Sequence, residues 1–159
     1  MREYSETITS KVRDYLNKEE YHFLEDDGIF RMSMNLKGRV GSTNVLIEVR
    51  RNDFMVFARC PLDADPDKPE ELQELSTFFC DVNYKLLSGK FEVDLTDGQL
   101  EYMVFTDCEG LEDGPTMAMV ENSIGVAAGM LQRYGNGILG ILFSGLTASQ
   151  AMELCSRGK

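Results

Sequence analysis

Apolar and polar residues alternate along the chain with two different periods, and each period predicts a different kind of element. Near the start, apolar side chains recur every three or four positions among charged neighbours, at Tyr4, Ile8, Val12, Tyr15 and Leu16. This spacing places them on one side of an amphipathic helix. We expect this helix to end before the turn-forming residues 25–28.

Beyond residue 28 the apolar residues occupy every second position, which is the period of a strand with one buried face. Three such stretches follow one another, at residues 30–36, 45–49 and 54–60. A loop at residues 38–42 and a tight turn at residues 52–53 separate them. Strands joined by such short connections run antiparallel.

The second half of the chain repeats both periods. It predicts a helix over residues 72–86 that stops at Ser88-Gly89, strands over 91–95 and 100–104 joined by a hairpin at Asp97-Gly98, and helices over 116–134 and 148–155. Gly135 and Gly137 should interrupt or end the helix before them, because glycine weakens a helix; residues 138–143 would add a further buried turn or two. Thr147 with Gln150 forms the capping-box pattern that starts a helix.

The order of these elements is a helix, three strands, a helix, two strands and two helices. It predicts an α+β fold with one five-stranded antiparallel sheet and helices packed mainly on one face. A chain of 159 residues has the size of one domain and buries enough surface to fold without disulfides or metal. We therefore expect a single domain over residues 1–159.

Two segments carry a resemblance to a known family. The run from Asp81 to Asp94, with Asn83 in a helix before a strand that starts at Gly89-Lys90-Phe91, and the ending Arg133-Tyr134-Gly135 followed by apolar residues and Gly145, resemble the YbjN family. The resemblance covers residues 3–155 and implies a bacterial sensory-transduction regulator. It also implies a fold similar to type III secretion chaperones, a homodimer that binds other molecules, and no catalytic residues to carry over.

The charge of the chain is strongly negative and unevenly placed. The formal net charge is −11, which would repel a phosphate backbone, so we expect no nucleic-acid partner. Residues 28–60 nevertheless hold six basic and two acidic residues, whereas residues 61–115 hold three basic and fifteen acidic residues. The basic segment coincides with the first three predicted strands, and the uneven placement points to an acidic or amphipathic protein partner.

Strand periodicity places the basic residues on one sheet face. If Met34, Ile47 and Val56 face the helices, the opposite face carries Arg31, Leu46, Arg50, Met55, Phe57 and Arg59. Arginine and aromatic residues are enriched at protein interfaces, and methionine adapts to varied partners. The alternative is a solvated face with scattered apolar residues. The composition favours a non-catalytic protein-binding module, chaperone-like or of an adaptor or regulatory kind.

The acidic loop offers a second, different hypothesis. Asp63, Asp65, Asp67 and Glu74 imitate the spacing of a calcium-binding loop, which would make the protein a metal- or small-ligand-responsive regulator. The position that requires glycine is occupied by Lys68. A solvated loop leading into a helix explains the same residues, and we expect no metal and no cofactor.

Enzymatic activity is not expected. His22, the single histidine, lies at the end of the first predicted helix without a group nearby to orient it. Cys60, Cys80, Cys108 and Cys155 form no CxxC pair and are expected to be small buried apolar residues.

Three further segments bear on location and assembly. The first twenty residues contain no apolar run typical of a signal peptide, and the apolar stretch 137–146 falls well short of the ~20 residues that span a bilayer. We therefore expect a cytoplasmic protein that is not embedded in a membrane. Gly125 and Gly129 form a GxxxG pattern on the third predicted helix, which indicates either homodimer contact or tight packing within the chain.

Overall fold

The fold is a single antiparallel sheet with four helices, and the computed structural model describes residues 1–157. The sheet order is β1-β2-β3-β4-β6-β5, and every neighbouring pair is antiparallel. The strands are β1 (Phe23–Asp26), β2 (Ile29–Asn35), β3 (Ser42–Val49), β4 (Asp53–Arg59), β5 (Lys90–Val93) and β6 (Leu100–Asp107). The predicted α+β class is confirmed, but the sheet has six strands instead of five.

The additional strand is β1, which the sequence pattern did not predict. The first helix, α1 (Glu6–Lys18), ends before residue 19, so His22 lies in an exposed linker and not in a helix. Residues 23–26 then pair with β2. Asp27 and Gly28 both have positive φ, at 51° and 77°, as a two-residue hairpin turn requires. The four residues of β1 are too few and too polar to show a clear alternation.

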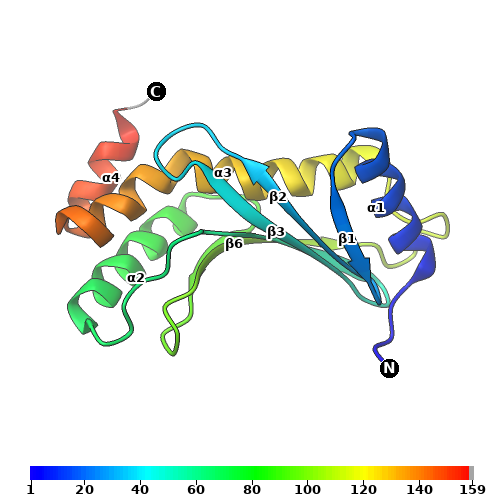
Figure 1. Cartoon of the computed structure of the whole chain (residues 1–159), viewed down its shortest axis with the longest axis horizontal. Helices are drawn as coiled ribbons and strands as arrows, with labels where there is room; N and C mark the ends of the chain where they lie inside the picture. The colour runs from blue at the N-terminus through cyan, green and yellow to red at the C-terminus, as the bar shows by residue number, and fades with distance from the viewer. Residues whose placement is uncertain (158–159) are drawn as a thin grey trace.

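The remaining helices are α2 (Pro69–Tyr84), α3 (Met117–Ser144) and α4 (Ala148–Ser156). In Figure 1, α3 runs along the length of the molecule, α1 lies at one end and α2 and α4 lie at the other. The capping box at Thr147 and Gln150 is present at the start of α4. Helix α2 ends at Tyr84, four residues before the predicted stop.

Helix α3 is continuous through the glycines that were expected to interrupt it. A Cβ atom on Gly137 would lie 2.7 Å from Phe78 Cζ and 2.8 Å from Cys155 Sγ, and one on Gly135 would lie 2.5 Å from Val40 Cγ2. These glycines therefore permit close packing that offsets their low helix propensity. The helix instead ends at Gly145, which takes the left-handed conformation with φ of 62°.

The connection between β5 and β6 also differs from the expected tight hairpin. Strand β5 ends at Val93 and β6 begins at Leu100, so a six-residue loop replaces a two-residue turn. Within it Gly98 has positive φ. Asp94 and Gln99 close the loop through a backbone hydrogen bond of 2.9 Å.

The helices cover one face of the sheet and leave the other uncovered. Strand residues that point toward the helices, such as Phe30, Val56 and Tyr102, have no exposed surface, whereas their neighbours in sequence are half-buried or exposed. The Ser123 hydroxyl of α3 lies 2.6 Å from the Thr106 hydroxyl of β6 on the covered face.

In the described part of the chain, none of the helices combines the length and apolar character needed to cross a bilayer.

Candidate functional site: the open face of the sheet

The surface opposite the helices, here called the open face, is built from side chains of all six strands. Registers between neighbouring strands align one continuous row across it, consisting of Leu24, Arg31, Leu46, Phe57, Met103 and Lys90. A second row consists of Ile29, Glu48, Met55 and Phe105. A third consists of Ser33, Asn44, Arg59, Glu101 and Glu92.

The centre of the open face is apolar. Leu46, Met55 and Phe57 are half-buried, although no helix covers them. Phe105 is 49% exposed and Leu24 is 75% exposed. Side chains of neighbouring strands are close enough to form a continuous surface, and an uncovered apolar surface of this kind is a candidate for an interaction site.

Most of the charged groups around this centre are paired. The Arg59 Nε atom lies 3.1 Å from Glu101 Oε2, and Lys90 Nζ lies 2.6 Å from Glu92 Oε1. These pairs neutralise the rim of the open face. Its remaining cationic group is supplied by Arg31, which is exposed and has no ion pair within residues 1–157.

Arg50 lies at the border of the open face. Its Nε atom donates a 2.6 Å hydrogen bond to Asp53 Oδ1, which raises the pKa of the guanidinium. The same guanidinium carbon lies 5.9 Å from the centre of the Phe105 ring, within the range of a cation–π contact. The structure thus places all six residues of the predicted surface on one side of the sheet, with Arg50 at its margin.

A shallow hollow of about 340 Å³ lies on the open face beside Arg31. It is lined by residues of the first four strands, namely Leu24, Arg31, Met32, Ser33, Asn44, Val45, Leu46 and Arg59. Two guanidinium groups, a hydroxyl and an amide border its apolar base. This combination can hold an apolar side chain together with a hydrogen-bond acceptor.

Four apolar residues of the open face were not predicted from the sequence. Leu24 belongs to the unexpected strand β1, Ile29 opens β2, and Met103 and Phe105 belong to β6, which pairs with β4. The alternation in β6 is visible in the sequence, but no short turn indicates which strand lies beside it. The pairing of β4 with β6, whose partner residues lie more than forty positions apart in the sequence, is therefore set by the tertiary structure.

One edge of the sheet is closed by a side chain. Asn83 at the end of α2 accepts a 2.8 Å hydrogen bond from the Phe91 N–H and donates a 3.0 Å bond to the Phe91 carbonyl. These two backbone groups of the edge strand β5 are therefore unavailable to an added strand. This favours recognition through the open face over strand addition at β5.

The acidic loop does not assemble the calcium-like ligand set. The Asp65 Oδ1 atom accepts a hydrogen bond from the Asp67 N–H, and Glu74 Oε2 accepts one from the Ala148 N–H of α4. Over residues 1–157 no three acidic, histidine or cysteine side chains converge as metal ligands would. Asp63, Asp65, Asp67 and Glu74 are thus distributed along a loop and a helix.

The cysteines differ in their surroundings, and all four are free thiols. Cys60 and Cys108 are buried as expected, and burial raises the pKa of both thiols, that of Cys108 to about 11. Cys155 is half-buried, and its thiol pKa is also raised by burial. Cys80 is exposed on α2, so the expectation that every cysteine is buried is wrong.

Comparison with known proteins adds evidence on the fold. No protein-family model and no curated protein sequence matches the chain. Among solved structures, the crystal structure of YbjN from E. coli, described as a candidate transcription regulator, superposes with a TM-score of 0.53 at 14% identity. The match covers 79% of this chain and 92% of that one. Over that part of the chain the fold is therefore similar to that of YbjN, as the resemblance at residues 81–94 and 133–145 predicts.

Proposed function

We propose that this protein is a non-catalytic binding module of an adaptor or regulatory kind, which holds a segment of a protein partner on its open face. The observation that carries this proposal is the contrast between the two faces of one sheet. The covered face is buried, while the other presents Leu46, Phe57 and Phe105 without a helix above them.

The likeness to a candidate transcription regulator supports a regulatory role, and the open face supports its being exerted through protein contacts. A chain with a net charge of −11 is repelled by a phosphate backbone. The absence of nucleic-acid binding therefore stays part of the proposal. So does the cytoplasmic location, which rests on the sequence prediction alone. The similarity to type III secretion chaperones stays a prediction.

We also propose that the module is a homodimer. Gly125 and Gly129 on α3 have open space where a Cβ would be added, so tight packing within the chain does not explain them. A second copy approaching this side of α3 would use that space. Sedimentation velocity should show a dimer at high protein concentration, and a monomer at every concentration would contradict this part of the proposal.

The open face can be tested by site-specific photo-crosslinking in the native host. A photoreactive phenylalanine analogue at Met103 should give a discrete crosslinked product with another protein. Phe57→Asp should remove that product, because a carboxylate at the apolar centre has to be desolvated on binding.

A matched control uses Leu111→Asp, which places the same charge on a partly exposed loop residue away from the open face. This variant should retain the crosslink. If Phe57→Asp retains it too while circular dichroism shows both variants folded, the open face is not the binding surface.

A further inference from the structure

The hollow beside Arg31 on the open face differs from the rest of this acidic protein in the charge of its lining. The chain holds 27 acidic and 16 basic residues. The residues that line the hollow include two arginines, Arg31 and Arg59, and no aspartate or glutamate. A local excess of positive charge around an apolar hollow favours an anionic group on the molecule that occupies it.

The two arginines stand on either side of strand β3. Arg31 of β2 is in register with Leu46 of β3, and Arg59 of β4 is in register with Asn44, two positions away on the same face. Leu46 and Asn44 therefore lie between the two arginines, in the middle of the hollow. A segment seated on β3 can contact both arginines and the half-buried Leu46 at once.

The polar groups of the hollow are mostly donors without an acceptor. Arg59 binds Glu101 through Nε at 3.1 Å, which leaves its Nη groups able to donate. The Asn44 Oδ1 atom accepts a 3.1 Å hydrogen bond from the Ser33 hydroxyl, so the acceptor of this amide is used and its NH₂ group remains able to donate. A carboxylate only accepts hydrogen bonds, and guanidinium groups bind it most strongly. It is therefore the side-chain group that matches this set of donors.

The carboxylates of the chain itself do not pair with Arg31. On the open face, Glu48 Oε1 lies 3.1 Å from Arg2 Nη2, and Asp26 is in register with Ile29, one row away from Arg31. Within residues 1–157, Arg31 forms no ion pair. Its charge is thus available to a second molecule.

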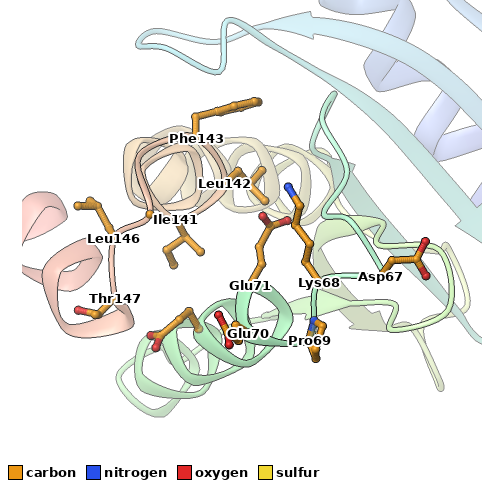
Figure 2. Close-up of a pocket in the computed structure, with 12 residues that line it drawn as sticks. Asp67, Lys68, Pro69, Glu70, Glu71, Ile141, Leu142, Phe143, Leu146 and Thr147 are labelled. Atoms are coloured by element: carbon orange, nitrogen blue, oxygen red, sulfur yellow. The ribbon is translucent and has the colours of Figure 1, made fainter.

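A larger hollow elsewhere in the protein shows the opposite situation. It has a volume of about 580 Å³ and lies between the start of α2, the end of α3 and the start of α4 (Figure 2). Two of its carboxylates already accept hydrogen bonds within the chain, Glu71 from the Asp65 N–H and Glu74 from the Ala148 N–H. The Phe143 ring points away from them in Figure 2. Size alone therefore does not indicate a site, whereas unused donors beside an apolar floor do.

We propose that Arg31 anchors a glutamate or aspartate side chain of the segment held on the open face; this rests on the binding function proposed above and adds the chemistry of the bound segment. The carboxylate receives N–H groups from Arg31, and Arg59 and the Asn44 amide add positive potential from the other side of the hollow. An apolar side chain beside it in the segment covers Leu46 and Phe57, which follow Arg31 in the same row. A basic segment is repelled, and a wholly apolar one leaves the arginine desolvated without a partner.

The test uses a fluorescent nine-residue peptide titrated against the full chain. Its odd positions are serine and its even positions are one glutamate followed by three leucines, so an extended peptide presents these four side chains on one face, about 6.6–6.8 Å apart. We expect saturable binding by anisotropy, with NMR amide shifts in the strands of the open face and not in the helices. A matched peptide with glutamine in place of the glutamate should bind at least about tenfold more weakly, because it loses a charge-assisted contact.

Arg31→Gln should weaken binding of the glutamate peptide at least about tenfold and change that of the glutamine peptide less than about twofold. Changing protein and peptide together isolates the contact between the two groups. Arg39→Gln is the matched control, because Arg39 is exposed in the loop between β2 and β3 and also forms no ion pair in the described chain. It should change either affinity less than about twofold.

The carboxylate anchor is overturned if the glutamate peptide does not bind saturably, if the two peptides bind equally, or if Arg39→Gln weakens binding as much as Arg31→Gln. The photo-crosslink at Met103 distinguishes a failure of this anchor from a failure of the binding function. Arg31→Gln should reduce the yield of the crosslinked product. If Phe57→Asp removes the product and Arg31→Gln leaves it unchanged, the binding function stands and the anchor is wrong; if neither folded variant changes it, both are wrong.

Discussion

At the residue scale, a single amide side chain occupies backbone groups at one edge of the sheet. Asn83 hydrogen-bonds both the N–H and the carbonyl of Phe91 in β5. It thus supplies one donor and one acceptor to groups that a further strand would otherwise pair. Sheet edges left unpaired promote association between copies of a protein.

Asn83→Ala removes both of these hydrogen bonds. We expect the free energy of unfolding to fall by roughly 1–3 kcal/mol, because two partly buried backbone groups lose their partners. We also expect light scattering to increase on storage, as the edge becomes available. Urea denaturation measures the first effect, and Asn136→Ala on the exposed side of α3 serves as the control, with little change in either quantity.

At the element scale, helix α3 shows that glycine can be present within a helix for two different reasons. Gly137 is buried against Phe78 and Cys155, whereas a Cβ atom on Gly129 would meet no neighbouring side chain within 4 Å. The first glycine is required by packing. The second has no such requirement within one chain.

Gly137→Ala should destabilise the protein by roughly 1–3 kcal/mol, because the added methyl group overlaps its neighbours in a close-packed core. Gly129→Ala should instead stabilise it by roughly 0.5–1 kcal/mol through helix propensity alone. Thermal and urea unfolding in dilute solution, where association contributes least, compare the two. Equal effects of the two substitutions would contradict the packing explanation for Gly137.

At the scale of the whole molecule, an ion pair connects the N-terminal helix to the edge of the sheet. Arg13 of α1 binds Glu25 of β1 in a bidentate pair, with an Nε–Oε2 distance of 2.8 Å and an Nη2–Oε1 distance of 2.6 Å. The hydrogen bond from Arg13 lowers the pKa of the Glu25 carboxyl. The pair therefore stabilises the folded state when that carboxyl is ionised.

Because the pKa of Glu25 is lower in the folded than in the unfolded chain, its contribution is complete above the unfolded value of roughly 4.3 and is lost as the pH falls through the folded value. Arg13→Ala should lower the free energy of unfolding by about 0.5–1 kcal/mol near neutral pH. The difference from the wild type should shrink in acid. Urea denaturation across this pH range measures it. Arg51→Ala, whose pair with Glu3 is 77% exposed on both sides, should show no comparable pH dependence.

Particular residues show how far the sequence could predict the fold and the site. Val45, Ile47 and Val49 are buried at alternate positions, as their spacing indicates, and so Leu46 was correctly assigned to the opposite face. The Asp63–Glu74 spacing, by contrast, matched a metal loop whose side chains do not meet. Spacing along the chain specifies faces within an element, but it does not specify whether a loop closes around a ligand.

The sequence by itself determined the type of most elements, the antiparallel pairing of β2, β3 and β4, and the residues of these strands that share the open face. These properties are local, since they depend on the 2.0 and 3.6 periods of the backbone and on short turns. The tertiary structure decided the pairing of β4 with β6, the continuity of α3 through Gly137 and the hollow between α2 and α3. Each of these depends on contacts between distant segments, whose packing energy outweighs local propensity.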